Sequence, residues 1–160
     1  MRFLTGEEEK RAKKWFDYAA NIAKNAKCLK KKCGSIIVKN NEVIGVGYNA
    51  PPLDNVVLEC IKESLPKDFK SEKHCCLHAE QNAIIDALFN YSKKIQGSTL
   101  YYTKVDKNNI IQFSGKPYCT ICSKMALRVK ISEFAVWHKE GICVYGTDEY
   151  NKLSFEYRKT

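Results

Sequence analysis

The spacing of apolar and polar residues divides the chain into helical and strand-like segments. From residue 5 to residue 27, apolar side chains recur three or four positions apart, which predicts an amphipathic helix. Thr5 and Glu8 have the spacing of a capping box, which favours a helix start at this point. The apolar stripe comprises Ala12, Trp15, Phe16, Ala19, Ile22, Ala23 and Ala26. We therefore expect a helix with one apolar face.

The next segment, CGSIIVKNNEVIGVGYN, predicts a two-stranded hairpin. Two β-branched runs flank Asn40 and Asn41, which tolerate the left-handed conformations of a tight hairpin turn. Residues 50–76 are different, because they contain three prolines, many charges and three cysteines without clear periodicity. This is long for a structureless loop in a compact domain, so either something ties it down or it moves.

The second half of the chain alternates helices and strands. Helical spacing covers residues 78–89 and 119–128, and strand-like sequence covers residues 98–104 and 133–139. The sequence KEG then favours a turn into ICVYGT, and a last helix is expected from Asp148. This order predicts an α/β fold, a three-layer αβα sandwich. Its mixed central sheet includes the N-terminal β-hairpin and carries helices on both faces.

Length and composition limit the class of protein. A chain of 160 residues fits one domain with a hydrophobic core, so we expect residues 1–160 to form a single domain. The first residues have no apolar stretch with a cleavage site, and no run of eighteen apolar residues occurs. We therefore expect a soluble cytoplasmic protein with no membrane partner.

The formal net charge of +9 suggests a phosphate-bearing partner, which could be a nucleotide, a nucleic acid or an anionic membrane. The excess is almost all lysine, since the chain has only four arginines. A solvated basic surface is therefore favoured over a nucleic-acid footprint.

A metal site is indicated by three residues. Cys119 and Cys122 are three positions apart, so on a helix that starts there their side chains point about 60° apart and can share one ion. Zinc prefers thiolate and imidazole ligands, and three protein ligands with an open fourth position is the catalytic arrangement. His78 supplies the third ligand. Eight cysteines without an export signal fit reduced thiols better than a disulfide scaffold.

Glu80 follows His78 by two positions, and two such residues in mid-helix would project to nearly opposite sides. The motif must therefore lie at a helix start, where the positive end of the helix favours nearby anions. Zinc at an open site lowers the pKa of bound water to about 7. A nearby unligated carboxylate can take that proton and return it to the substrate ring and then to the leaving group. We expect Glu80 to be this proton shuttle.

The order H-x-E and then P-C-x-x-C is typical of zinc nucleobase deaminases. From about Cys33 to His138, the chain resembles the cytidine and deoxycytidylate deaminase superfamily, and most of all its deoxycytidylate (dCMP) deaminase group. The resemblance lies in the hairpin CGSIIVKNNEVIGVGYNAPP, the metal helix CLHAEQNAI and the cysteine helix CTICSKMAL. It implies that His78, Cys119 and Cys122 bind zinc and that Glu80 shuttles protons. It also implies that the Ala79 amide donates to the base carbonyl and that Asn49 contacts the sugar.

Two positions depart from the pattern of the group. Proline normally stands directly before the first cysteine of the pair, but here Tyr118 lies between Pro117 and Cys119. The glycines that follow GYN in the group are replaced by APP at residues 50–52. In members regulated by nucleoside triphosphates this segment lines the effector site, so that regulation is not expected to carry over.

Other interpretations of the cysteines and histidines remain. Cys119 and Cys122 alone could form a redox pair or be buried thiols, and a structural zinc site would need a fourth protein ligand. The resembling group includes members with a second, structural zinc, so one is a hypothesis for the long loop. Its candidate ligands are Cys60, His74, Cys75 and Cys76, with buried thiols and a surface histidine as the default. We expect Cys28, Cys33 and Cys143 to lie in the core and His138 to be structural.

The leading functional hypothesis is hydrolytic deamination of a cytosine nucleotide, dCMP, to the uracil nucleotide and ammonia. The first alternative is an editing deaminase acting on tRNA or single-stranded nucleic acid, which the positive charge and aromatic residues such as Tyr48 or Tyr118 would suit. Deamination of a free nucleoside or of another base is also open. The non-enzymatic alternative is a zinc-stapled binding module. Exposed apolar helix faces, together with the resemblance, predict a homo-oligomer.

Overall fold

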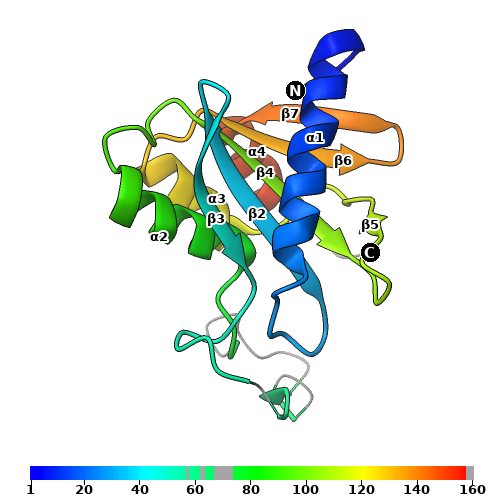
Figure 1. The fold of residues 1–160 in the computed structure, drawn as a ribbon, viewed down its shortest axis with the longest axis vertical. Helices are drawn as coiled ribbons and strands as arrows, with labels where there is room; N and C mark the ends of the chain where they lie inside the picture. The colour runs from blue at the N-terminus through cyan, green and yellow to red at the C-terminus, as the bar shows by residue number, and fades with distance from the viewer. Residues whose placement is uncertain (57, 62–63, 67–73, 158–160) are drawn as a thin grey trace.

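A seven-stranded mixed sheet forms the centre of the computed structural model, which describes residues 1–56, 58–61, 64–66 and 74–157 (Figure 1). The strand order is β1-β7-β6-β4-β2-β3, and β5 pairs with β4. The β4–β6 pair is parallel and the other pairs are antiparallel. The strands are β1 (Arg2–Phe3), β2 (Lys32–Lys39), β3 (Glu42–Tyr48), β4 (Thr99–Val105), β5 (Ile111–Gln112), β6 (Glu133–His138) and β7 (Gly141–Gly146).

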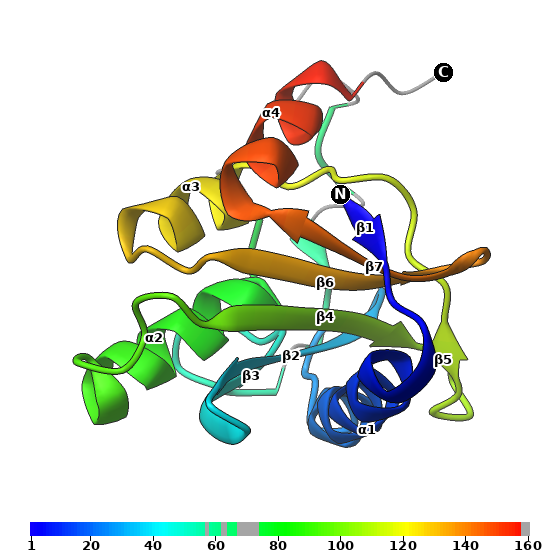
Figure 2. The ribbon, with the colours of Figure 1, turned by 90° about the horizontal axis from the view of Figure 1, so that it is seen from above.

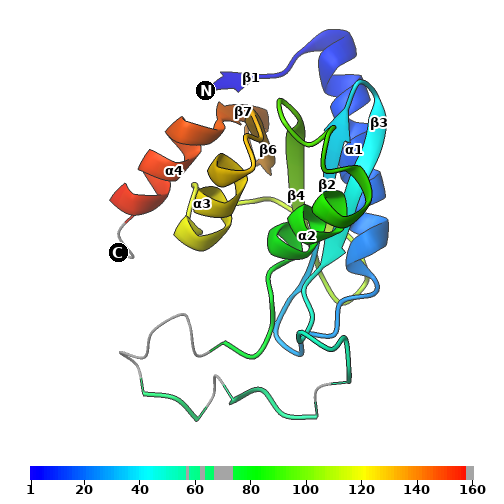
Figure 3. The ribbon, with the colours of Figure 1, turned by 90° about the vertical axis from the view of Figure 1, so that its left-hand side faces the viewer.

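Helices cover both faces of this sheet. One face carries α1 (Gly6–Ala23), and the other carries α2 (Ala79–Tyr91), α3 (Thr120–Arg128) and α4 (Thr147–Glu156) (Figure 3). Helices α3 and α4 lie side by side (Figure 2). The structure therefore confirms the predicted three-layer αβα sandwich with its mixed sheet.

The two halves of the core follow from alternation along the strands. In β2, Ile36 packs with Ala19 on the α1 side, while the next residue, Ile37, packs with Ala83 on the α2 side. Successive side chains of a strand point to opposite faces, so a continuous apolar run is what a sheet covered on both sides requires. The central strands are therefore buried on both faces.

The hairpin forms as its turn residues predict and brings α2 unusually close to β3. Asn40 and Asn41 have φ values of 51° and 60°, the left-handed conformation of a tight turn. At Gly47, an added Cβ would lie 2.3 Å from the Ala79 carbonyl oxygen and 2.3 Å from the Ala83 nitrogen. Only glycine fits there, because the first turn of α2 rests directly on the strand backbone.

The long segment after the hairpin is tied at its two ends. The Leu77 amide donates a 2.8 Å hydrogen bond to the Ala50 carbonyl, which forms an isolated antiparallel bridge. This bridge holds the residue before His78 next to the end of β3. Residues 57, 62–63 and 67–73 of the predicted 50–76 loop lie outside the described residues.

Some details differ from the sequence prediction. Helix α1 ends at Ala23, not at residue 27, and Thr5 is its N-cap without a side-chain capping hydrogen bond. The two-residue strands β1 and β5 were not predicted, because two residues carry no readable periodicity. Within the part of the chain that the structure describes, no helix has the length and apolar character to span a bilayer.

Candidate metal centre

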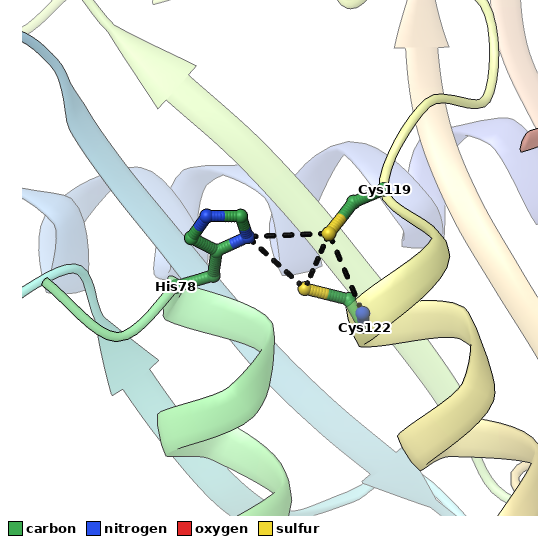
Figure 4. Close-up of side chains that lie close together, drawn as sticks. All are labelled: His78, Cys119 and Cys122. Carbon is green, nitrogen blue, oxygen red and sulfur yellow. Dashed lines mark hydrogen bonds between the residues drawn. The ribbon is translucent and has the colours of Figure 1, made fainter. Parts of the chain in front are cut away.

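The starts of two helices meet at the predicted metal site (Figure 4). His78 is the N-cap of α2 and Cys119 is the N-cap of α3. The His78 Nδ1 atom lies 3.2 Å from the Cys119 Sγ and 3.3 Å from the Cys122 Sγ, and the two sulfurs are 3.1 Å apart. The three residues predicted as ligands are thus brought together from segments about forty positions apart in the sequence.

Local hydrogen bonds fix both helix starts. The His78 amide donates to the side-chain oxygen of Gln81 at 2.9 Å, which satisfies an amide that the first turn of α2 leaves unpaired. In α3, the Cys122 amide donates to the Cys119 sulfur at 3.4 Å. His78 and Cys119 thus occupy the N-cap positions of α2 and α3, so the positive ends of both helices lie at the site.

The donor set fits zinc. With bonds of about 2.3 Å to sulfur and about 2.0 Å to nitrogen, a tetrahedral zinc ion places its sulfurs about 3.8 Å apart and sulfur and nitrogen about 3.6 Å apart. The His78 nitrogen and the two cysteine sulfurs need to move apart by only about 0.3 to 0.7 Å to reach that geometry. Three such ligands leave a fourth position, as in catalytic zinc sites. Elsewhere among the described residues, no other three His, Cys, Asp or Glu ligand atoms lie within 4.8 Å of one another.

The pKa values of the two thiols shift in opposite directions, so Cys119 ionises more readily than Cys122. The hydrogen bond with Cys122 lowers the pKa of Cys119 to about 4, and His78 contributes to the same effect against the opposing effect of burial. The hydrogen bond with Cys119 and burial raise the pKa of Cys122 well above its ordinary value. A metal ion that binds both sulfurs must therefore displace the Cys122 proton, which makes metal binding pH-dependent.

Glu80 lies on the first turn of α2 and is 6% exposed. Burial raises the pKa of its carboxyl to about 7, and the Cys119 sulfur adds to this effect, whereas His78 opposes it. A carboxyl with this pKa can both hold and release a proton near neutral pH, as general acid–base catalysis requires. The structure thus puts the predicted proton shuttle in a suitable environment.

Two tyrosines near Glu80, the buried Tyr150 and the partly buried Tyr102, were missed by sequence reasoning. Tyr150 on α4 stacks on Phe134 with ring centroids 4.2 Å apart. Burial is the main cause that raises the pKa of Tyr150, and the nearby Glu80, Cys122 and Cys119 add to the increase. Tyr102 on β4 lies with its hydroxyl 3.4 Å from the Cys33 sulfur. No sequence signal identifies these contacts, because they depend on how distant strands and helices pack.

The two predicted substrate contacts differ in what holds them. Asn49 is buried, and its side chain accepts a 2.8 Å hydrogen bond from the Cys33 amide and donates a 2.7 Å bond to the Lys31 carbonyl. The side-chain amide of Asn49 thus holds two backbone segments in place and has one further N–H that can donate a hydrogen bond. Ala79 is the first residue of α2 and is fully buried. Amides in a first helical turn have no partner within the helix, so the role of the Ala79 amide as a donor to the base stays a prediction that this position allows.

The long-loop cysteines do not form a comparable cluster. The sulfurs of Cys75 and Cys76 lie 3.8 Å apart, and burial together with Cys75 raises the pKa of Cys76 to about 12. The ring centroids of His74 and His78 lie 6.2 Å apart. Cys60 is buried. The hypothesis of a second zinc therefore remains without a converged ligand set in the described segments.

The other cysteines and His138 have structural positions. Cys33 and Cys143 are buried as predicted, and Cys28 is half-buried. All eight cysteines are free thiols. His138 is buried, with Nδ1 3.0 Å from the Ser114 carbonyl oxygen and Nε2 2.8 Å from the Tyr145 hydroxyl. These contacts confirm a structural histidine.

One surface hollow lies away from the metal centre. It has a volume of about 260 Å³ and is lined by residues that include Arg11, Trp15 and Lys39, on the α1 side of the sheet. The His78 site lies on the opposite side, at the starts of α2 and α3. The chemistry of this protein is thus indicated by its donor set and not by the size of a hollow.

Comparison with known proteins identifies the family. Residues 9–138 match the family described as the cytidine and deoxycytidylate deaminase zinc-binding region. This match covers most of the chain and includes all three metal ligands and Glu80. The protein belongs to this family of zinc-binding deaminases.

Two relatives are deoxycytidylate deaminases of yeasts. The Schizosaccharomyces pombe enzyme is 27% identical over 130 residues, which are 76% of this chain and 34% of the relative. The Saccharomyces cerevisiae enzyme is 33% identical over 88 residues, which are 52% of this chain and 27% of the relative. The chain thus spans about a third or less of the length of these relatives.

Solved structures show the same fold. The dCMP deaminase of the cyanophage S-TIM5, in complex with dCMP and dUMP, superposes with a TM-score of 0.56 at 25% identity over 82% of both chains. A cytidine deaminase from Burkholderia pseudomallei superposes with a TM-score of 0.57 at 14% identity, over 86% of this chain and 94% of that one. The second likeness supports the cytidine deaminase-like fold alone.

Proposed function

We propose that this protein is a zinc-dependent hydrolase that deaminates a cytosine nucleotide, dCMP, with water to dUMP and ammonia. The observation that carries the proposal is the convergence of His78, Cys119 and Cys122 beside the buried Glu80. A structural zinc site would not need this carboxyl. The family of the chain gives the reaction class, and the two deoxycytidylate deaminases and the dCMP-bound phage structure support the choice of dCMP.

In this mechanism, Glu80 moves the protons. Zinc held by the three ligands supplies Lewis acidity at its open position and makes water there more acidic. The Glu80 carboxylate accepts a proton from the attacking water and delivers it to the ring nitrogen of cytosine. It then accepts the second proton of that water, from the hydroxyl group added to the ring carbon, and passes it to the departing amino group, which leaves as ammonia while the carbonyl of uracil forms.

The substrate is oriented by groups around the start of α2. The Ala79 amide donates to the carbonyl of the base, and the remaining N–H of Asn49 contacts the sugar. Asn49 is held by two backbone partners, so this second contact would be made without moving the side chain. The substrate phosphate is bound by cations or amides among the basic residues, which fits the net charge of +9.

An ammonia-release screen tests the function. We expect purified protein to release ammonia fastest from dCMP among cytosine, cytidine, deoxycytidine, CMP, dCMP, dCTP, guanine and a tRNA. Glu80→Gln should lower kcat about a thousandfold with zinc content unchanged, because an amide of similar shape cannot carry the proton. Glu140→Gln, at an exposed residue of the β6–β7 turn, is the matched control and should retain full activity.

Three results would contradict the proposal. Activity on tRNA with none on free nucleotides would assign the protein to the editing class. Full activity of the Glu80→Gln variant would show that the proton shuttle lies elsewhere. A protein with bound zinc and no activity on any of these compounds would support the binding-module alternative.

Assembly and location belong to the same proposal. We propose a cytoplasmic homo-oligomer of single-domain chains, because α2 exposes the large apolar residues Leu88, Phe89 and Tyr91 near its end. Light scattering on the purified protein checks this, and a mass equal to one chain of 18.4 kDa would contradict it. A second, structural zinc bound by the loop cysteines also remains a proposal, and the zinc stoichiometry checks it.

A further inference from the structure

Tyr118 and Tyr157 form an exposed aromatic pair beside the metal centre. Their ring centroids lie 5.0 Å apart with an interplanar angle of 86°, an edge-to-face contact. Tyr118 remains 66% exposed, although it directly precedes the metal ligand Cys119. A large ring left in solvent next to a reactive centre is a candidate for contact with the substrate.

The more exposed ligands of the metal centre are His78 and Cys119, and Tyr118 directly precedes Cys119 in the chain. Cys122 is fully buried and Glu80 is nearly so, whereas His78 and Cys119 are half-buried. A substrate therefore approaches past His78 and Cys119. Consecutive Cα atoms are about 3.8 Å apart, so the backbone of Tyr118 adjoins this opening, and a side chain of its length can reach a substrate there.

Helix α4 supports the position of the Tyr157 ring. The Ser123 hydroxyl of α3 donates a 2.8 Å hydrogen bond to the Asn151 side chain of α4, which ties the two helices together. The Tyr157 amide donates to the Leu153 carbonyl at 3.1 Å, so the last turn of α4 carries Tyr157. The aromatic pair is thus built from the start of one helix and the end of its neighbour.

We propose that Tyr118 is a substrate-contact residue whose ring packs against the pyrimidine nucleoside part of the nucleotide, and that Tyr157 is the positioning residue that holds this ring. The inference rests on the proposed function. It also gives a role to the departure from the resembling group, because an aromatic ring occupies the position where that group has proline. Stacking on an aromatic ring accepts a pyrimidine without hydrogen bonds and adds affinity.

Steady-state kinetics with dCMP test this inference. Tyr118→Ala should raise KM about tenfold and leave kcat within about twofold, because the contact is made equally in the bound and transition states. Tyr118→Phe should retain the KM of the unchanged enzyme, since the ring and not the hydroxyl makes the contact. Zinc content should stay unchanged in both variants.

A positioning role of Tyr157 predicts a smaller change in KM than the contact made by Tyr118. Tyr157→Ala should raise KM about threefold, and the double variant should be no worse than Tyr118→Ala, because Tyr157 acts only through Tyr118. Tyr18→Ala is the control, since Tyr18 is 46% exposed on α1, which covers the opposite face of the sheet from His78. It should leave KM unchanged.

The outcomes separate this inference from the proposed function. An unchanged KM in Tyr118→Ala, in an enzyme that deaminates dCMP, overturns the aromatic contact and leaves the function intact. If Tyr118→Ala loses zinc, Tyr157→Ala decides, because it leaves the Cys119 backbone untouched, and an unchanged KM there overturns the inference. A wild-type protein that deaminates no nucleotide contradicts both.

Discussion

Two groups of cysteines in this chain differ in how the backbone presents them. Cys119 and Cys122 occupy the first turn of α3, and their sulfurs meet the His78 ring at 3.2 and 3.3 Å. Cys75 and Cys76 are adjacent residues before α2, with sulfurs 3.8 Å apart. No third ligand converges with this pair in the described parts of the chain. Residue types suitable for zinc are thus present in both places, but only one place brings three of them together.

The difference lies in the helix ends. A spacing of three on a first helical turn directs both sulfurs to the same side, and the positive helix end favours the thiolate. In an irregular segment, no regular backbone geometry directs the side chains of adjacent residues such as Cys75 and Cys76 to the same side. The charges show the same contrast, since the pKa of Cys119 is lowered to about 4 and the pKa of Cys76 is raised to about 12. A ligand set therefore needs an ordered backbone as well as the correct residue types.

The largest expected effect comes from removing one converged ligand. Cys122→Ala should lose the catalytic zinc and reduce deamination to background, because two remaining ligands hold the ion poorly. Cys75→Ala is the matched control and should retain that zinc and activity within about threefold of wild type. Zinc analysis and the ammonia assay measure both. Equal losses of zinc and activity in the two variants would break the comparison and show that the loop cysteines also support the catalytic site.

A smaller effect is expected when the helix start is displaced. Gly47→Ala should destabilise the fold by about 3 kcal/mol and weaken zinc binding, because the new methyl group would meet the first turn of α2. Urea unfolding and zinc titration measure these changes. Gly115→Ala is the control, since nothing lies within 4 Å of the corresponding Cβ position. A stable Gly47→Ala variant with full zinc affinity would show that the contact between α2 and β3 does not place His78.

The smallest effect is a difference in thiol reactivity in the zinc-free protein. With a pKa of about 4, Cys119 stays a thiolate as the pH falls from 9 to 5, so its alkylation by iodoacetamide should hardly slow over that range. Cys76, with a pKa of about 12, should react about tenfold more slowly at pH 7, since the lower nucleophilicity of an acidic thiolate offsets part of the difference. Mass spectrometry of the alkylated peptides reads both rates, and zinc should protect Cys119. Faster labelling of Cys76 would reverse the comparison.

Most of the fold was predictable because its signals are local. The hairpin turn at Asn40 and Asn41, the apolar stripe of α1 and the helix that starts after His78 all follow from short-range spacing. Gln81 was missed, although its position three residues after the helix cap is a recognisable capping-box signal. The short strands β1 and β5 and the contacts of Tyr102 and Tyr150 had no such signal, because they arise between segments far apart in the chain.

The amino-acid sequence by itself determined which side chains are chemically able to bind zinc and move a proton, because residue type and spacing set donor chemistry and helical direction. Only the tertiary structure decided that the starts of α2 and α3 meet, that Glu80 is buried and that Tyr118 contacts Tyr157. Burial and convergence depend on the packing of distant segments against one sheet. That packing shifts the pKa values of these groups and leaves the loop cysteines without a third ligand in the described residues.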